Sequence, residues 1–130
     1  MYEIEWKKDP DYLDSYYCQT KNSRGQTIRC EVYRIGHGKR QFNFSFCIKQ
    51  KRKLDFPHNQ ITGRDGIRSL LWAYECLKSA ITLLKTLHPG SIIEVWGDSL
   101  RKQQIYKRYL MPLGFKVKQN QYKELYLNIE

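Results

Sequence analysis

The stretch that decides the fold is ITGRDGIRSLLWAYECLKSAITLLKTLHPGSIIEVWG, residues 61–97. Within it, apolar side chains recur at steps of three and four residues, which is the spacing of one face of an α-helix. These positions are Ile67, Leu70, Leu71, Tyr74, Leu77, Ile81, Leu84 and His88. Pro89 cannot continue the helical ladder and Gly90 suits a left-handed exit, so we expect a long amphipathic helix that ends at HPG. The apolar run that follows it, residues 91–97, predicts a short buried strand.

The residues before this helix predict β-structure. Four segments are rich in aromatic and β-branched residues and alternate with period two: residues 2–6, 15–20, 27–35 and 41–49. In the last segment one face carries Phe42, Phe44, Phe46 and Ile48, and the other carries Asn43, Ser45, Cys47 and Lys49. Turn signals around Gly25 and Gly36 separate the later strands, so residues 15–49 should form an antiparallel meander. The basic loop 49–60 contains Pro57 and is expected to lack regular structure.

The residues after the buried strand predict one more helix and two more strands. Residues 99–110 read as a strongly basic helix that Asp98 or Ser99 can cap. GFKVKQ and YKELYLNI then read as two strands joined by a turn that contains Asn120. The chain, residues 1–130, is therefore expected to be one α+β domain: a mixed, twisted sheet with a long central helix and a second, basic helix. The step from Gln41 to Gly97 should be a right-handed parallel β-α-β crossover.

Composition narrows the environment and the chemistry. The 130 residues include four cysteines without a C-x-x-C pair, and the three histidines do not stand at metal-ligand spacing from them. We expect reduced, packed thiols, no metal site and a cytoplasmic protein. The starting Met is followed by charged residues, and no apolar run reaches about 18 residues, so neither a signal peptide nor a membrane span is expected.

The net charge of +10 makes an anionic partner plausible. Basic residues cluster at a strand turn, in the loop before the long helix and on the last helix. The candidates for binding nucleic acid or an acidic protein are Lys39, Arg40, Lys49, Lys51, Arg52, Lys53, Arg101, Lys102, Lys107 and Arg108. No helix-turn-helix, zinc-finger or RNA-recognition signature accompanies them, so sequence-specific readout is not indicated. The alternative for each cluster is a solvated basic surface.

The order of elements and three local sequences resemble the GNAT superfamily of N-acetyltransferases. QITGRDG lies between a strand and a long helix, where that family carries its phosphate-binding loop, and IIEVWGDS supplies the strand after the helix. RKQQIYKRYLMPLGFK resembles the family's late helix, which bears a tyrosine and runs into a Gly-Phe that opens the next strand. The resemblance covers residues 41–130 and implies a fold that binds acetyl-CoA or another acyl-CoA.

The turn before the long helix is where this resemblance implies a pyrophosphate site. Unpaired N–H groups and the positive end of the dipole at a helix start attract phosphates when glycines permit close approach. The implied residues are Gln60, Gly63, Arg64, Gly66, Ile67 and Arg68. In the frame that starts at Gln60, Asp65 stands where the family has Gly or Ala. In the frame with Gly66 as the central glycine, Gly63 stands where the family has Gln or Arg, and Arg68 where it has Gly or Ala. An ordinary helix start, with Thr62 as N-cap and Asp65 three positions on, accounts for the same residues.

The resemblance also implies a catalytic acid, Tyr106, which would protonate the departing thiolate. Tyr109, one turn later, competes for that role, and the candidate bases are Glu31, Glu94 and Asp98. Only eight residues separate Trp6 from Ser15, where family members usually place two helices that form part of the acceptor site. Two functions therefore stay open. One is direct, metal-free transfer from acyl-CoA to an amine; the other is a catalytically silent GNAT-like protein that binds nucleic acid or an acidic protein through its basic patches.

Overall fold

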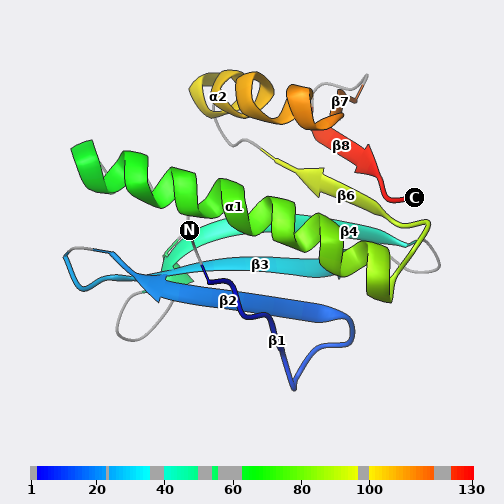
Figure 1. The fold of residues 1–130 in the computed structure, drawn as a ribbon, viewed down its shortest axis with the longest axis horizontal. Coiled ribbons are helices and arrows are strands. Elements are labelled where there is room, and N and C mark those ends of the chain that lie inside the picture. The colour runs from blue at the N-terminus through cyan, green and yellow to red at the C-terminus, as the bar shows by residue number, and fades with distance from the viewer. Residues whose placement is uncertain are drawn as a thin grey trace.

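The computed structural model of the chain describes residues 3–22, 24–35, 40–49, 54–55, 63–96, 100–118 and 124–130. These residues form an α+β domain in which two helices accompany one mixed, open sheet (Figure 1). In the described part of the chain, seven strands follow the order β1-β2-β3-β4-β6-β8-β7, and an eighth, β5, pairs with β4 off this path. The predicted α+β class is confirmed.

The predicted meander is present. β2 (Ser15–Lys21), β3 (Thr27–Ile35) and β4 (Gln41–Lys49) pair antiparallel in chain order. Alternation sends Cys30, Val32 and Phe44 into the core on one face of the sheet. The intervening residues of β3 and β4 lie on the opposite face, where Tyr33 pairs with Asn43 and Glu31 pairs with Ser45.

Two expectations about the edges of this meander are wrong. Residues 3–6 form no strand; β1 is Lys7–Lys8, which pairs with β2. The reason is that Trp6 Nε1 donates a hydrogen bond to Ser79 Oγ, 2.9 Å away, so the segment packs against a helix instead of alternating along the sheet. The basic loop, expected to lack regular structure, contains β5 (Leu54–Asp55), which pairs antiparallel with the end of β4.

The long helix is α1 (Gly63–Leu87), and its predicted end is confirmed because Gly90 has a φ of +83°. Figure 1 shows it lying across the face of the meander. Its buried residues are Ser69, Trp72, Ala73, Cys76, Leu77, Ala80 and Leu84. Leu70 and Leu71, predicted for the apolar face, are instead 43% and 51% exposed. The helical period locates a stripe, whereas burial also requires sheet beneath it, and these two leucines line a cavity.

The helix connects two parallel neighbours, as expected. β6 (Ile92–Val95) pairs with β4 in parallel, from Gln41 with Ile92 to Phe44 with Val95. α2 (Leu100–Leu110), the 3₁₀ turn η1 (Met111–Leu113), β7 (Lys116–Val117) and β8 (Leu125–Asn128) follow. β8 pairs antiparallel with both β6 and β7. The predicted caps of α2 and the turn with Asn120 lie outside the described residues.

The four cysteines are free and buried. Cys18 Sγ lies 3.5 Å from Cys76 Sγ, which joins β2 to α1, and Cys30 belongs to the same core cluster. On the opposite face of the sheet, burial, with a smaller contribution from the charge of Glu31, raises the pKa of Cys47 to about 12. Neither helix, as far as the structure describes them, is long and apolar enough to cross a membrane.

Candidate functional site

A cavity of about 940 Å³ opens where β4 and β6 stop pairing. Phe44 and Val95 form their last pair, and both line the cavity together with Ser45 and Trp96, the next residue of each segment. Core-side and polar-side residues of β4 contribute, so the cavity reaches both faces of the sheet. Its volume is typical of pockets that hold a small molecule or cofactor.

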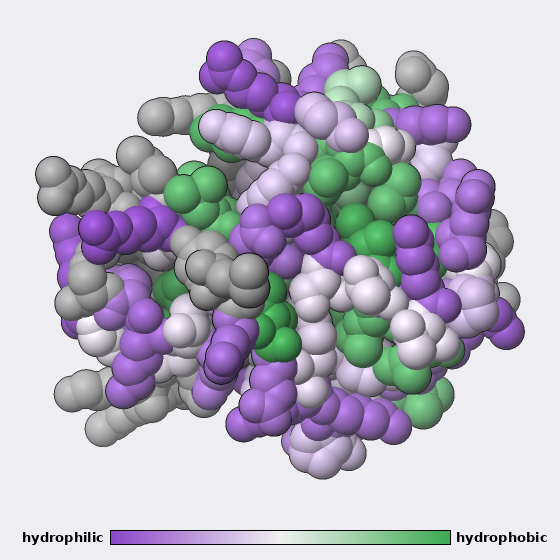
Figure 2. Space-filling view, viewed as in Figure 1, coloured by the Kyte–Doolittle hydropathy of each residue, from purple (hydrophilic) through white to green (hydrophobic). Residues whose placement is uncertain are grey.

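The helix side of the cavity is apolar and aromatic. Leu70, Leu71 and Tyr74 of α1 line it, as do Tyr106 and Tyr109 of α2. The rings of Tyr74 and Tyr109 meet edge to face, with centroids 6.3 Å apart. On the face shown in Figure 2, apolar side chains gather over β6 and the neighbouring part of α1. Large apolar groups that stay accessible beside a cavity mark a binding surface.

The sheet side of the cavity carries charge. Arg29 Nε lies 2.8 Å from Glu31 Oε1, and an Nη of Arg29 lies 3.9 Å from Asp9 Oδ2. The same guanidinium is stacked 3.9 Å from the centroid of the Tyr17 ring. Asp9, Arg29, Glu31 and Arg34 all line the cavity, so its described lining holds two carboxylates and two guanidinium groups. Asp9 and Glu31 hold Arg29, and Asp14 holds Arg34.

Beside this group lies an amide whose oxygen has no partner. Asn43 is only 4% exposed, and its Nδ2 donates a hydrogen bond to Tyr33 Oη, 2.8 Å away. Its Oδ1 is buried and accepts no hydrogen bond from any residue that the structure describes. A buried carbonyl without a donor costs free energy, so this oxygen is suited to a ligand that brings an N–H.

Some of the predicted catalytic residues line the cavity and others do not. Tyr106 lines the cavity, as does its competitor Tyr109, which is 54% exposed. Of the candidate bases, Glu31 lines the cavity, whereas Glu94 is not among the described residues that do. Glu94 is 2% exposed and is engaged by Lys118 and by Trp96 Nε1, 3.1 Å away. Asp98 lies outside the described residues.

The predicted phosphate loop is described only in part. Gly63, Arg64, Gly66 and Ile67 form the helical start of α1, and their side chains lie outside the described set, as does Gln60 altogether. Arg68 is exposed and stands two positions before Leu70, the first described residue of α1 that lines the cavity. In the sequence, the start of α1 therefore comes directly before the residues of α1 that line the cavity.

The predicted basic patches are also described in part. Lys107 and Arg108 are exposed on α2, and Arg40 is exposed with its Nη1 donating to the Pro89 carbonyl, 3.0 Å away. Only the backbone is described for Lys49, Arg101 and Lys102. Lys39, Lys51, Arg52 and Lys53 lie outside the described residues. None of these basic residues whose side chains are described lines the cavity.

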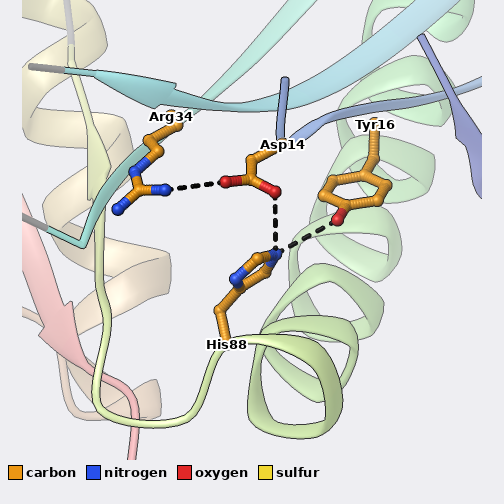
Figure 3. A network of polar contacts seen from close by, with 4 residues as sticks. All are labelled: Asp14, Tyr16, Arg34 and His88. Carbon is orange, nitrogen blue, oxygen red and sulfur yellow. Dashed lines mark hydrogen bonds and ion pairs between the residues drawn. The ribbon is translucent and has the colours of Figure 1, made fainter. Parts of the chain in front are cut away.

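A second polar cluster, which the sequence did not indicate, closes the far end of α1 (Figure 3). Asp14 Oδ2 accepts a hydrogen bond from Arg34 at 2.8 Å, and Asp14 Oδ1 lies 3.6 Å from His88 Nε2. Tyr16 Oη lies 3.1 Å from the same nitrogen. Burial and the charge of Asp14 raise the pKa of Tyr16. This cluster joins the end of α1 to β2 and β3 and acts as a structural clamp.

The described residues contain no group of three or more His, Cys, Asp or Glu side chains arranged to hold a metal ion. In comparisons with known protein families, with curated proteins and with solved structures, none matched the chain. The function proposed for the chain is accordingly based on the geometry of the cavity.

Proposed function

We propose that this chain is a divergent GNAT-like protein that binds an acyl-CoA and transfers its acyl group directly to an amine. The observation that carries the proposal is the cavity at the end of the β4–β6 pairing, with Tyr106 and Glu31 in its walls. A tyrosine and a carboxylate in one cavity are the acid and base that acyl transfer to an amine requires.

The order of elements supports the GNAT-like fold. An antiparallel meander leads through α1 into the parallel neighbour β6, and α2 leads into the last two strands. Gly114, with a φ of +102°, and the buried Phe115 sit at the place of the family's Gly-Phe, directly before β7. We take the β4-α1-β6 connection to be the right-handed crossover expected of such a unit.

The sheet offers a place for the extended arm of an acyl-CoA. Residues 45–47 of β4 pair with β3 on one side and with no described strand on the other. An arm that contains amides would pair with a strand edge of this kind. The pyrophosphate would then lie at the start of α1, near Gly63, Gly66 and Arg68, where the helix dipole favours negative charge.

The chemistry proposed for the side chains follows from their positions. Acyl-CoA supplies a thioester whose carbonyl carbon is open to attack by nitrogen. Glu31 takes a proton from the acceptor's ammonium and so frees the lone pair that attacks. Tyr106 gives its phenolic proton to the sulfur as the C–S bond breaks, and its phenolate regains the proton that nitrogen loses in becoming an amide. No metal is needed for these steps.

A binding role without catalysis is the second candidate. The observation that favours it is the exposure of Lys107 and Arg108 on α2 in a chain of net charge +10. Such residues would neutralise phosphates of a nucleic acid or carboxylates of an acidic protein, and the affinity would fall steeply with salt.

One experiment separates the two candidates: thermal unfolding with acetyl-CoA, beside a salt-titrated nucleic-acid binding assay. At about 100 times its dissociation constant, acetyl-CoA should stabilise the protein by about 2.7 kcal/mol. Gly66→Glu, which adds bulk and negative charge at the start of α1, should abolish the shift. Thr86→Glu adds the same charge at an exposed position of the last turn and should leave it unchanged. No shift at millimolar acetyl-CoA would contradict the enzyme proposal, and salt-sensitive nucleic-acid binding would then favour the second.

A further inference from the structure

We infer that the cavity selects a small organic monocation: one ammonium group carried on an apolar, aromatic body. In the proposed function, this ligand is the acyl acceptor. That identification, and only that, rests on the proposed function. Binding of such a cation is a property of the cavity walls themselves, so it is measurable without any acyl-CoA.

The charge of the cavity walls carries the first step. Among the described lining side chains, Asp9 and Glu31 contribute two negative charges and Arg29 one positive charge, so these three leave a formal excess of one carboxylate. Arg34 also lines the cavity, but its charge is balanced by Asp14 at 2.8 Å. With the Arg34–Asp14 pair counted as neutral, the described part of this wall is negative, whereas the chain as a whole carries a net charge of +10. It favours a cation and disfavours a carboxylate or phosphate at this wall.

The buried amide carries the second step. Asn43 Oδ1 has no donor among the described residues, and Tyr33 fixes the amide from its other side through the 2.8 Å hydrogen bond. An ammonium group brings N–H donors and would satisfy this oxygen while facing Glu31, two positions before Tyr33 on β3. A neutral hydroxyl would supply one hydrogen bond and no charge.

The aromatic lining of the cavity indicates what kind of body the ammonium group is attached to. Tyr74, Tyr106, Tyr109 and Trp96 line the cavity from α1, α2 and the end of β6. Leu13 adds a further apolar side chain, 76% exposed, from the turn before β2. An apolar body gains free energy by covering these groups, and aromatic faces also attract a cation. A flexible polyamine would cover little of this surface and would add charges for which the described lining has no further carboxylates.

The test is calorimetric titration of the full chain, without acyl-CoA, with four probes. We expect 2-phenylethylamine to bind at least about tenfold more tightly than 2-phenylethanol, which keeps the body and removes the charge. Phenylacetate and spermidine should bind more weakly still. Equal affinity for the amine and the alcohol, or a preference for phenylacetate, would overturn the inference.

Two variants locate the site. Glu31→Gln should weaken the binding of 2-phenylethylamine by about fivefold to tenfold and leave the binding of 2-phenylethanol nearly unchanged. Glu75→Gln is the matched control, because Glu75 is a half-exposed carboxylate of α1 paired with Lys78 at 2.8 Å, away from the cavity lining. An equal effect of the two variants would place the cation elsewhere and overturn the inference. The probe series on the unaltered chain decides the question if Glu31→Gln fails to fold.

Failure of the inference is distinguishable from failure of the proposed function. Selective binding of 2-phenylethylamine without any stabilisation by acetyl-CoA would support the cation site and contradict acyl transfer. Stabilisation by acetyl-CoA without a preference for the amine over the alcohol would support the proposed function and overturn the cation site.

Discussion

Lys118 Nζ donates a hydrogen bond to Oε1 of Glu94, a carboxylate that is only 2% exposed on the inner strand β6. Glu124 adds a second carboxylate 3.6 Å from the same ammonium group. Partial burial alone would lower the pKa of Lys118, but the hydrogen bond and charge of Glu94, with help from Glu124, raise it above its usual value. The pair lets a charged side chain occupy the interior of the sheet.

Removing the lysine should therefore be costly. Lys118→Met leaves Glu94 buried without its cation, and we expect the free energy of unfolding to fall by about 3 kcal/mol. The measurement is urea unfolding at neutral pH. Lys116→Met makes the same change at an exposed position of β7 and should cost little. The double variant Lys118→Met with Glu94→Gln should recover part of the loss, whereas additive losses would contradict a charge-based cause.

Tyr106→Phe tests the proposed acid. The variant keeps the ring in the cavity wall and removes only the phenolic proton, so kcat for acyl transfer should fall by about a hundredfold with acetyl-CoA binding unchanged. Tyr109→Phe is the matched control one turn later, and its edge-to-face contact with Tyr74 does not need the hydroxyl. The measurement is product formation followed by mass spectrometry. An equal fall in both variants would remove Tyr106 from the proposed role.

Cys47 gives a prediction about alkaline pH. Its thiol is fully buried, and burial raises its pKa from 9.0 in the unfolded chain to about 12. The folded state holds this proton more tightly than the unfolded chain does. The protonated thiol's contribution to the free energy of unfolding is therefore complete below about pH 9 and is lost as pH rises towards 12. Between about pH 8 and pH 10 the free energy of unfolding should fall by about 1 kcal/mol more than in Cys47→Ala. Parallel pH profiles of the two proteins would contradict this assignment.

Substituting two glycines that have positive φ distinguishes the cost of backbone strain from the cost of side-chain crowding. Gly90 has a φ of +83° and open space where a Cβ would lie, so Gly90→Ala should cost about 1 kcal/mol for the left-handed backbone alone. Gly114 has a φ of +102°, and an added Cβ would lie 3.3 Å from Leu127 Cδ1. Gly114→Ala should therefore cost about 2 kcal/mol, measured by urea unfolding. A smaller loss at Gly114 than at Gly90 would contradict the crowding.

The regular parts of the fold were predictable because their periods are visible in the sequence. Alternation identified β2, β3 and β4, and the three-and-four spacing identified α1 with its end at Pro89 and Gly90. The errors arose where a contact distant in sequence decides the outcome. Trp6 turns away from a strand because Ser79 is its partner, and Leu71 stays exposed because a cavity lies beneath that part of the helix.

The site was less predictable than the fold. The resemblance pointed to Tyr106, and Glu31 was one of three possible bases that only the fold could sort. The pairing of Asn43 with Tyr33 depends on the register of β4 on β3. Strand alternation placed Asn43 on the polar face of its strand, but it carries no information about which residue lies opposite or which amide atom is left without a partner.

The outer strands of the described sheet have a consequence for how copies of the chain meet. β1 and β7 are two residues long each, and three of their four residues are lysines: Lys7, Lys8 and Lys116. A neighbouring copy that tried to extend the sheet would find few backbone groups to pair with and would bring like charges together. The borders of the sheet thus oppose edge-to-edge aggregation, which protects a protein whose central strands are rich in aromatic and β-branched side chains.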